Sequence, residues 1–552
     1  MTSFTLDRNV MENLVGKKFY DEELRDKIVL MGVEVDNMNE KEIIVDITPN
    51  RPDLLSDQGF SRAFASFIGE KKGLKDYKTK SSGEKLIVDK NANEVRPYTA
   101  CAIVKNLKFN DEKIKEIIQI QEKLHGTYGR NRKKLAIGIY PLEKIKFPVT
   151  YCAKKPEDIL FVPLEESKEM NGFQILSQTK TGKEFAHLLD GKELYPIFID
   201  ANKQILSMPP IINSDNVGKI TQNTNDVFVE CSGFDYDALS KCLNIIVTAL
   251  ADMGGEIYSL EINYADGKKI SPDLNCEEMK IDINYVNKIL GLKLSEAEVK
   301  DCLEKMGFSY EKNKVKIPCY RIDILHERDF VEDIAIGYGY NNFKAEIPKV
   351  ATIGEEDKFE KFCSKVANIL VGLKCNEVST YHLLSLEELN DKMLLNYPPI
   401  KVSSASIDFS YLRNWMIPSL MRVLTGNQHN EYPQNIFEIG ICFKVDPKEE
   451  THVKEFKRLA ICLCDEKADF TMIKQVLDAL CNAIDVKYEV REINHDSFIS
   501  GRCARVTING LDVAYIGEIN PQVLENWGLQ MPVAALELNL SELFNNEKHK
   551  IN

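Results

Sequence analysis

The chain has 552 residues, of which 44% are hydrophobic and 28% are charged, and its formal net charge is −14. At roughly 150 residues per domain, this length corresponds to about three to four domains. The composition excludes collagen-like, disulfide-scaffold and wholly disordered proteins, and no run of about 18 or more apolar residues predicts a membrane-spanning helix. The acidic charge disfavours a protein that binds nucleic acid mainly by itself. If the chain binds nucleic acid, either a partner supplies most of the phosphate contacts or the chain contacts only a small part of the ligand.

The cysteines predict a reducing compartment. The fourteen cysteines include no Cys-x-x-Cys pair, and the first residues carry neither an apolar signal core nor an Arg-rich transit pattern. Free buried thiols are typical of cytoplasmic proteins, so we expect a cytoplasmic location. Cys462 and Cys464 alternate along a predicted strand and are expected to pack in a core rather than to bind zinc.

The chain contains an internal repeat. Two segments share an aspartate, a glycine nine residues later and a second glycine sixteen residues after that: Asp7, Gly16 and Gly32, then Asp282, Gly291 and Gly307. Each copy predicts a strand, a helix that ends at glycine, a second capped helix that ends at glycine, and then strands. An Arg-x-Asp sequence closes both copies, at Arg51 and at Arg321. We therefore predict two small domains of one α+β design.

Two further domains are expected. Short β-rich runs bounded by turn residues fill the region between the copies, and a buried helix is predicted over 239–251. After about residue 350, a helix with an apolar face over 359–373 precedes strands, which predicts an antiparallel sheet with helices on one side. That apolar face fits either the core of its own domain or a subunit interface. We assign the domains to residues 1–90, 95–268, 272–347 and 350–552.

An acidic cluster follows the second Arg-x-Asp sequence. On a helix over 327–338, Asp329, Glu332 and Asp333 fall opposite the apolar face, and Asp323 lies just upstream. Carboxylates in this number suit Mg²⁺, although a solvated acidic face near a helix N-terminus is the alternative. The corresponding positions of the first copy carry no acid, so the repeated fold does not require these acids: Gly59, Arg62 and Ala63.

Two other regions are candidate sites. Residues 206–235 concentrate hydroxyls, amides and acids at strand ends, as in a pocket for a polar ligand, although turn chemistry explains the same residues. The basic loop 125–134 contains Tyr128 and could contact phosphates and stack a base, or could simply be solvated. No phosphate-binding loop, dinucleotide fingerprint, zinc-protease motif or Gly-x-Ser-x-Gly motif occurs.

Five stretches together resemble the phenylalanyl-tRNA synthetase beta-subunit family of the shorter archaeal and eukaryotic type: residues 48–56, 206–214, 321–342, 432–440 and 517–521. The resemblance covers nearly the whole chain in order. It implies an α+β multidomain protein with two winged-helix-like repeated domains, a β-rich B3/B4-type editing domain, a B5-type domain and a class II synthetase-like core that has lost its catalysis. The inserted oligonucleotide-binding-fold domain and the C-terminal anticodon-binding domain of the bacterial form are not expected.

The resemblance also implies partners and a cofactor. The family forms a heterotetramer of two alpha and two beta subunits, in which the alpha subunit binds ATP and phenylalanine and charges tRNA(Phe). Residues 500–552 agree, because they lack the Gly-rich, Arg-ending motif that holds ATP in class II enzymes. The implied Mg²⁺ ligands, in a site shared with the alpha subunit, are Asp323, Asp329, Glu332 and Asp333.

The middle domain of the family hydrolyses tyrosine that is mischarged on tRNA(Phe). A hydrophobic pocket rejects an added hydroxyl only about 100-fold, so a second pocket with polar groups is needed. The implied substrate-binding residues are Leu206, Asn213, Ser214, Asp215 and Ser232. Glu230 or Asp235 would orient a water molecule or bind the tyrosine hydroxyl.

Two alternatives remain. The family usually carries threonine at Ser232 and a small residue at Phe234, so a beta subunit that only scaffolds its partner is the second hypothesis. A freestanding deacylase is the third, and the full-length last domain argues against it because an editing enzyme alone would not need that domain.

Overall fold

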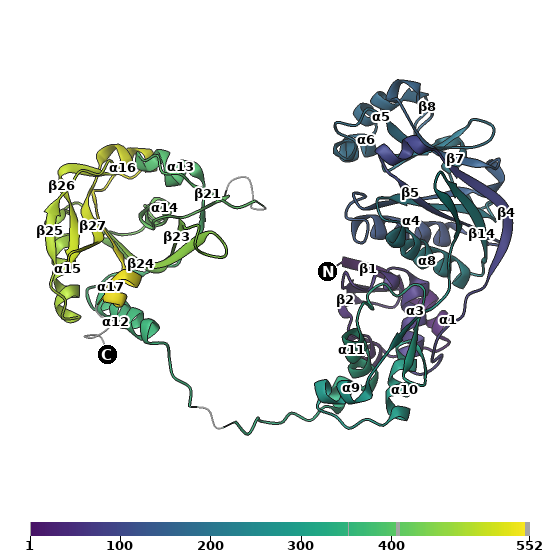
Figure 1. The fold of residues 1–552 in the computed structure, drawn as a ribbon, viewed down its shortest axis with the longest axis horizontal. Helices are drawn as coiled ribbons and strands as arrows, with labels where there is room; N and C mark the ends of the chain where they lie inside the picture. Colours follow the sequence, from purple (N-terminus) through teal and green to yellow (C-terminus); the bar gives the residue numbers. More distant parts are fainter. Residues whose placement is uncertain (1, 351–352, 404–408, 547–552) are drawn as a thin grey trace. The chain divides into compact units, whose positions relative to one another are not determined.

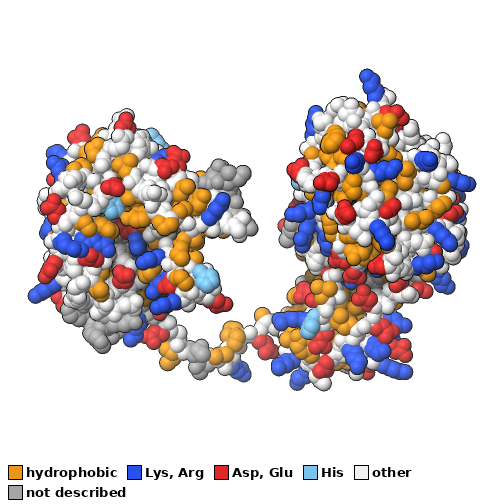
Figure 2. Space-filling view, turned by 45° about the horizontal axis from the view of Figure 1, so that its top comes forward, with side chains coloured by type: hydrophobic (Ala, Val, Ile, Leu, Met, Phe, Trp, Pro, Cys, Tyr) orange, Lys and Arg blue, Asp and Glu red, His pale blue; other side chains and the backbone are white. Residues whose placement is uncertain are grey.

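The structure is a computed structural model that describes residues 2–350, 353–403 and 409–546 (Figure 1). The chain divides into two compact units, Met1–Ile347 and Pro348–Asn552. The mixed helices and strands of both units confirm the α+β class. Among the described helices, none is long and apolar enough to span a membrane. Basic and acidic side chains are interspersed over the face seen in Figure 2.

The internal repeat is confirmed. The first copy consists of β1 (Thr2–Asp7), α1 (Arg8–Val15), α2 (Asp21–Leu30), β2 (Glu34–Met38), β3 (Glu42–Ile47) and α3 (Asp57–Phe67). The second copy has the same order: β16 (Glu277–Lys280), α9 (Ile283–Leu290), α10 (Glu296–Lys305), β17 (Ser309–Glu311), β18 (Lys314–Ile317) and α11 (Glu327–Tyr338). The strand orders are β1-β3-β2 and β16-β18-β17, so the two three-stranded antiparallel sheets have one topology.

Local interactions explain why both copies form the same helices. Asp7 accepts a hydrogen bond from the Val10 backbone, and Asp282 does the same for Asn284, so each side chain caps its helix. Gly16 and Gly291 then end these helices at φ of 88° and 68°, a conformation that glycine adopts without a Cβ clash.

The two Arg-x-Asp sequences form the same ion pair. The Arg51 guanidinium donates to both carboxylate oxygens of Asp53 at 2.9 and 2.8 Å, and Arg321 donates to both oxygens of Asp323 at 2.8 Å. The copies also pack on each other. Tyr320 of the second copy is buried in the core of the first, and Phe67 of the first packs against the core of the second.

A ten-stranded sheet lies between the copies in sequence. Its order is β12-β11-β10-β7-β4-β14-β5-β13-β6, with β15 paired to β14. The strands are β4 (Thr79–Val88), β5 (Tyr98–Lys105), β6 (Leu135–Pro141), β7 (Val149–Lys154), β10 (Tyr195–Ile199), β11 (Ile205–Met208), β12 (Ile212–Asn213), β13 (Val227–Gly233), β14 (Glu256–Tyr264) and β15 (Gly267–Ser271). Helices α4 (Asp111–Gly126) and α8 (Tyr236–Asp252) share one core with β5, β6, β13 and the first repeat copy.

Short elements complete the first unit at the β10–β12 end of this sheet. They are β8 (Leu160–Phe161), β9 (Met170–Asn171), α5 (Gly172–Gln178), α6 (Lys180–Phe185) and α7 (Asp215–Gly218).

The second unit has a seven-stranded sheet of order β19-β23-β24-β28-β27-β26-β25. Its strands are β19 (Asn376–Glu377), β23 (Gln434–Val445), β24 (Val453–Cys464), β25 (Glu489–Glu492), β26 (Phe498–Ile508), β27 (Leu511–Ile519) and β28 (Val533–Asn539). All neighbours are antiparallel except β19 and β23. The strands β20 (Leu383–Leu384), β21 (Ile400–Lys401) and β22 (Tyr411–Leu412) form a small separate sheet.

Helices cover both faces of this sheet, so the prediction of helices on one side was wrong. One core contains α12 (Lys358–Gly372), α15 (Phe470–Ala483) and α17 (Leu540–Asn546), and another contains α14 (Ile417–Gly426) and α16 (Pro521–Trp527). The short helix α13 (Leu386–Leu389) lies between β20 and β21 in sequence. Every residue from 459 to 464 on β24 is buried, as expected for a strand that is covered on both faces.

The burial of side chains tests two interpretations of the sequence, one for the apolar face of α12 and one for the cysteines. Phe362, Val366 and Leu370 of α12 are buried against the sheet of their own unit, which confirms the core interpretation of that apolar face. The fourteen cysteines all lie in described segments and are unpaired, and Cys462 and Cys464 are fully buried.

Candidate functional site

A cavity of about 180 Å³ lies in the middle sheet of the first unit. It is bounded by the end of α4, by β6, β11, β12 and β13, and by the turn between β11 and β12. The side chains and backbone that line it come from segments far apart in the sequence: Gln121, Glu122, His125, Arg132, Ala136, Ile137, Leu164, Thr181, Ser207, Pro209, Pro210, Ile211, Ile212, Asn213 and Glu230.

Glu230 is the only acid of this lining that is buried, with 1% of its surface exposed. It lies on β13, which pairs with β5 on one side and with β6 on the other, and its partner on β6 is Gly138. A Cβ atom at Gly138 would lie 2.6 Å from Glu230 Oε1 and 2.1 Å from the Tyr140 hydroxyl oxygen. The glycine therefore leaves the room that the carboxyl and the phenol occupy.

The phenol of Tyr140 is the centre of a buried polar group. Its hydroxyl lies 2.8 Å from Ser207 Oγ, 3.2 Å from Glu230 Oε1 and 3.4 Å from Asn213 Oδ1. Two further oxygens, Glu230 Oε2 and Ser232 Oγ, are buried and find no hydrogen-bond partner within the described part of the chain. A polar group of a ligand in the cavity would satisfy the Glu230 oxygen, because buried polar atoms are rarely left unpaired, whereas Ser232 does not line the cavity and interacts with the Glu230 carboxyl.

Burial dominates the electrostatics of Glu230. Desolvation raises the pKa of Glu230 to about 8, and the Tyr140 hydrogen bond and the charge of Arg96 oppose this rise only in part. The carboxyl is therefore mainly protonated at neutral pH. Burial also raises the pKa of Tyr140 well above its ordinary value, so the phenol stays neutral.

Arg96 supports the strand that carries these groups. It is 3% exposed, and its Nη2 donates to the backbone oxygen of Ser232 at 2.8 Å. Its guanidinium also lies 5.2 Å from the ring centre of Phe234, whose side chain is 52% exposed. Burial lowers the pKa of Arg96, although the nearby Tyr151 and Glu230 act in the opposite direction.

Two residues of the basic loop 125–134, His125 and Arg132, form part of the cavity wall. The Ile137 backbone donates to His125 Nε2 at 2.8 Å, so Nδ1 carries the proton of the neutral ring and faces Glu122 at 3.4 Å. Burial lowers the pKa of His125, which keeps that neutral form. Arg132 donates to the backbone oxygen of Ile211 at 2.9 Å and to Glu122 at 3.0 Å.

The structure brings together some of the predicted editing residues and separates others. Glu230 and Asn213 line the cavity, and Ser232 lies two residues further along β13. Leu206 is fully buried in the core behind them, beside Tyr140. Ser214 is buried at the start of α7.

Two predicted acids serve as local structure and do not line the cavity. Asp215 accepts a hydrogen bond from the Glu165 backbone at 3.1 Å. Asp235 is exposed and caps α8 by accepting from the Asp237 and Ala238 backbones.

Tyr140 and Arg96 were not selected from the sequence, and Ser207 was included only as part of the polar segment 206–235. Their roles depend on pairing between strands that are distant in sequence. One signal was available, because Gly138 interrupts an otherwise apolar strand, and glycine inside a strand often marks a close approach.

The acidic cluster of the second repeat copy is held by internal bonds. Arg321 is 5% exposed, and its Nη2 donates to Asp333 Oδ2 at 2.7 Å as well as to Asp323 at 2.8 Å. Asp329 Oδ2 accepts from the Leu325 and His326 backbones at 2.7 and 2.8 Å, at the start of α11. The exposed Glu332 accepts from the Tyr340 hydroxyl at 2.8 Å.

Asp329, Glu332 and Asp333 lie on one side of α11 by their spacing, but Asp333 is 5% exposed and pairs with the buried Arg321. Burial raises the pKa of Asp333 despite the charge of Arg321. Burial also acts to raise the pKa of Asp323, but the hydrogen bonds and charge of Arg321 and the charge of Arg51 hold it below its ordinary value.

In this arrangement the four carboxylates do not form a metal site by themselves. Within residues 2–350, 353–403 and 409–546, no three His, Cys, Asp or Glu side chains are grouped to hold a metal ion. The guanidinium of Arg321 pairs with both Asp323 and Asp333, at 2.8 and 2.7 Å. The Mg²⁺ assignment therefore stays a prediction.

Comparisons with known proteins agree along the whole chain. A family model described as "Phenylalanyl tRNA synthetase beta chain CLM domain" matches residues 344–540, and one described as "tRNA synthetase B5 domain" matches residues 279–340. The phenylalanine–tRNA ligase beta subunit of Pyrococcus furiosus is 40% identical over 559 residues, which cover 99% of this chain and 100% of that protein. The corresponding protein of Thermococcus sibiricus is 38% identical over 557 residues and 99% of each chain.

A solved structure is similar as well. It is the crystal structure of an N-terminal fragment of the phenylalanyl-tRNA synthetase beta subunit from Pyrococcus horikoshii, with 37% identity and a TM-score of 0.59. The match covers 61% of this chain and 99% of the fragment.

Proposed function

The chain belongs to the phenylalanine–tRNA ligase beta-subunit family, and from this premise we propose that it assembles with an alpha subunit and hydrolyses mischarged tyrosyl-tRNA(Phe) at the Glu230 cavity. In this proposal two alpha and two beta chains form the ligase, and the alpha chain binds ATP and phenylalanine and charges tRNA(Phe). The observation that supports the editing part is the buried Oε2 of Glu230, a cavity-lining residue, which finds no hydrogen-bond partner among the described residues.

The cavity has the chemistry to select tyrosine. Ile137 and Ile211 provide apolar walls, and the Glu230 carboxyl provides a polar end. We assign Glu230 Oε2 to the phenol of the bound tyrosine and Asn213 to the same polar end. A phenylalanine ring would leave the Glu230 oxygen unpaired, and sites built to bind a hydroxyl reject the analogue without it by roughly 10⁴- to 10⁵-fold.

The reaction is ester hydrolysis by water. The water oxygen adds to the carbonyl carbon of the tyrosyl ester, the bond from that carbon to the ribose oxygen breaks, and the ribose oxygen takes a proton. Free tyrosine and uncharged tRNA(Phe) are the products. This chain contributes by holding the tyrosine side chain, since Glu230 is mainly protonated at neutral pH and is poorly suited to remove a proton from water.

The magnesium prediction is not part of this mechanism. Asp323, Asp329, Glu332 and Asp333 remain the proposed contribution of this chain to a shared site, but Arg321 bonds two of them and no step is assigned to a metal.

The test is deacylation of tyrosyl-tRNA(Phe) by the purified chain with and without its alpha subunit, with phenylalanyl-tRNA(Phe) as the control substrate. We expect rapid release of tyrosine and slow release of phenylalanine. No release in either preparation would leave the chain as a scaffold subunit, which is the alternative function. Equal release of both amino acids would contradict tyrosine selection by the cavity.

A further inference from the structure

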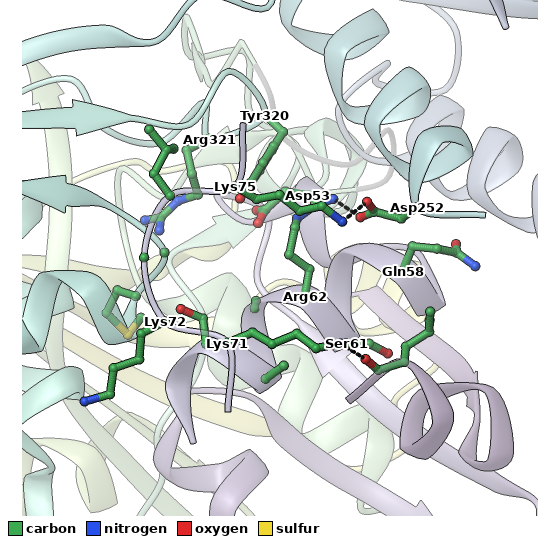
Figure 3. Close-up of a pocket in the computed structure, with 18 of the residues that line it drawn as sticks. Asp53, Gln58, Ser61, Arg62, Lys71, Lys72, Lys75, Asp252, Tyr320 and Arg321 are labelled. Atoms are coloured by element: carbon green, nitrogen blue, oxygen red, sulfur yellow. Dashed lines mark hydrogen bonds and ion pairs between the residues drawn. The ribbon is translucent and has the colours of Figure 1, made fainter. Parts of the chain in front are cut away.

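A second cavity, of about 340 Å³, lies where the two repeat copies meet the linker between α3 and β4 (Figure 3). It shares no lining residue with the cavity at Glu230. In Figure 3, Gln58, Ser61 and Arg62 come from α3, Lys71, Lys72 and Lys75 come from the linker, and Tyr320 and Arg321 come from the second copy. Three separate segments therefore surround one space.

The lining is basic although the chain is acidic. Six basic side chains line the cavity, against the carboxylates of Asp53 and Asp252: Arg51, Arg62, Lys71, Lys72, Lys75 and Arg321. Five of the six are paired with acids. Arg62 and Lys75 share Asp252 at 2.6 and 2.5 Å, and Lys72 bonds Asp301 at 2.6 Å. Arg51 pairs with Asp53, and Arg321 pairs with two aspartates of its own repeat copy.

Lys71 differs from the other linker lysines in its partner. The bond found for its ammonium goes to the backbone oxygen of Leu14, at 2.7 Å. A backbone oxygen leaves the positive charge uncompensated, and the ammonium keeps further hydrogens to donate. Lys71, Lys72 and Lys75 are all exposed, so the linker is the side from which a solute can enter.

Four buried polar atoms of the lining have no hydrogen-bond partner within the segments that the structure describes: Gln58 Oε1, Ser61 Oγ, Arg62 Nε and Arg321 Nη1. Gln58, Ser61 and Arg321 are 4%, 2% and 5% exposed. The guanidinium nitrogens can only donate, the serine hydroxyl can donate, and the glutamine amide can turn either end to a ligand. Most of these unpaired atoms can donate a hydrogen bond, so a ligand with several acceptor atoms would fit them.

We propose that this cavity binds a small phosphate-bearing anion. Arg62 and Arg321 donate to its oxygens from opposite sides, Ser61 adds a hydroxyl donor from α3, and Lys71 supplies charge at the entrance. A phosphate offers several terminal oxygens that point in different directions, which matches donors converging from three segments, whereas a carboxylate offers two oxygens in one plane. The cavity volume is sufficient for a small organic phosphate.

Because residues of both repeat copies line the cavity, a bound anion would affect how the two copies pack. Arg62 belongs to the first repeat copy and Arg321 to the second, so a bound anion contacts both copies and favours their packed arrangement. A ligand that binds only the folded state raises its stability by RT ln(1 + [L]/Kd), where [L] is the free ligand concentration. This inference does not depend on the editing activity.

The test uses the full-length chain and isothermal titration with inorganic phosphate, pyrophosphate and AMP at constant ionic strength set by chloride. We expect one saturable site per chain for at least one of these probes and a matching rise in the melting temperature. Ser61→Ala and Lys71→Met should each weaken binding roughly tenfold, the effect of one lost charge-assisted hydrogen bond. Lys78→Met, an exposed linker lysine outside the cavity lining, is the matched control and should bind as the parent does.

Both test variants are expected to fold, because Ser61 Oγ makes no intramolecular hydrogen bond in the described structure and Lys71 is exposed. Circular dichroism checks this directly. The proposal is overturned if no phosphate probe binds beyond the chloride background. It is overturned as well if both variants bind as the parent does, which would place the binding site outside this cavity. It is also overturned if Lys71→Met weakens tRNA binding but none of the small probes binds.

Discussion

The hydroxyl of Tyr140 lies 3.2 Å from Oε1 of Glu230, although the two residues are separated by 90 positions and lie on different strands of the middle sheet. Both side chains are buried, and Oε2 of the same carboxyl has no hydrogen-bond partner in the described part of the protein. The phenol thus fixes one oxygen of the carboxyl and leaves the other available to a ligand.

Two replacements of Glu230 distinguish a role in recognising the tyrosine hydroxyl from a role in proton transfer. We expect Glu230→Ala to slow tyrosyl-tRNA(Phe) hydrolysis by roughly 100-fold, because the hydroxyl of the substrate loses its partner. Glu230→Gln keeps a neutral polar group and should retain a large part of the rate. Single-turnover deacylation measures both variants, with phenylalanine charging by the alpha–beta complex as the control. Equal loss in the two variants would instead assign Glu230 the role of general base.

The same carboxyl makes stability depend on pH. The folded-state pKa of Glu230 is about 8, above its ordinary value of 4.5, so the folded chain holds the proton more tightly than the unfolded chain. Its contribution to stability is complete below about pH 4.5 and is lost as pH rises through about 8. Relative to the parent, Glu230→Gln should gain stability of the order of a few kcal/mol between pH 6 and pH 9, as measured by urea unfolding. A constant difference between the two proteins across that range would contradict the buried-acid assignment.

The lack of a side chain at Gly138 leaves space for the side chains of Glu230 and Tyr140. The Cβ added by Gly138→Ala would come within 2.6 Å of Glu230 Oε1, so the carboxyl and the phenol must move. We expect tyrosine release to fall at least tenfold while charging of tRNA by the complex is unchanged. Gly267→Ala is the control, since a Cβ there meets nothing within 4 Å. Normal editing by Gly138→Ala would show that this arrangement is not needed for hydrolysis.

The ion pair between Arg62 and Asp252 joins α3 to the end of α8 at 2.6 Å. The side chains are only 11% and 6% exposed, and Arg62 also lies 3.8 Å from the ring centre of Tyr320. Asp252→Ala leaves the guanidinium buried without its carboxylate, which typically costs about 3–5 kcal/mol. Urea unfolding of this variant and of the exposed control Asp266→Ala should differ by that amount. A cost below about 1 kcal/mol would mean that solvent reaches the arginine.

The magnesium prediction can be measured directly. Because Arg321 bonds Asp323 and Asp333, we expect the isolated chain to show no Mg²⁺ binding tighter than the millimolar range in equilibrium dialysis. Tight binding by the alpha–beta complex, removed by Asp329→Asn and Glu332→Gln together, would support a site completed by the partner. Micromolar binding by the isolated chain would contradict the arrangement described for Arg321.

The parts of the fold that depend on neighbouring residues were predictable. The aspartate caps and the left-handed glycines act within one turn of helix, so the spacing of Asp7 and Gly16, and of Asp282 and Gly291, was sufficient to predict the repeat. The candidate site was predictable only in part, because Glu230 stands in a polar segment but Tyr140 reaches it through strand pairing. The inward position of Asp333 was missed for the same reason, since its partner Arg321 precedes the helix and meets it only in the folded domain.

The contact between the two repeat copies sets a condition on how the protein folds during synthesis. The first copy buries Tyr320 in its core, so a ribosome that has finished Phe67 must add some 250 residues before that side chain exists. At roughly 5–20 residues per second, this takes on the order of 10 to 50 seconds. During that interval, the apolar surface of the first copy that later packs on Tyr320 is exposed to solvent. We therefore expect this chain to need chaperones during translation more than a protein in which each domain core is built from one continuous segment.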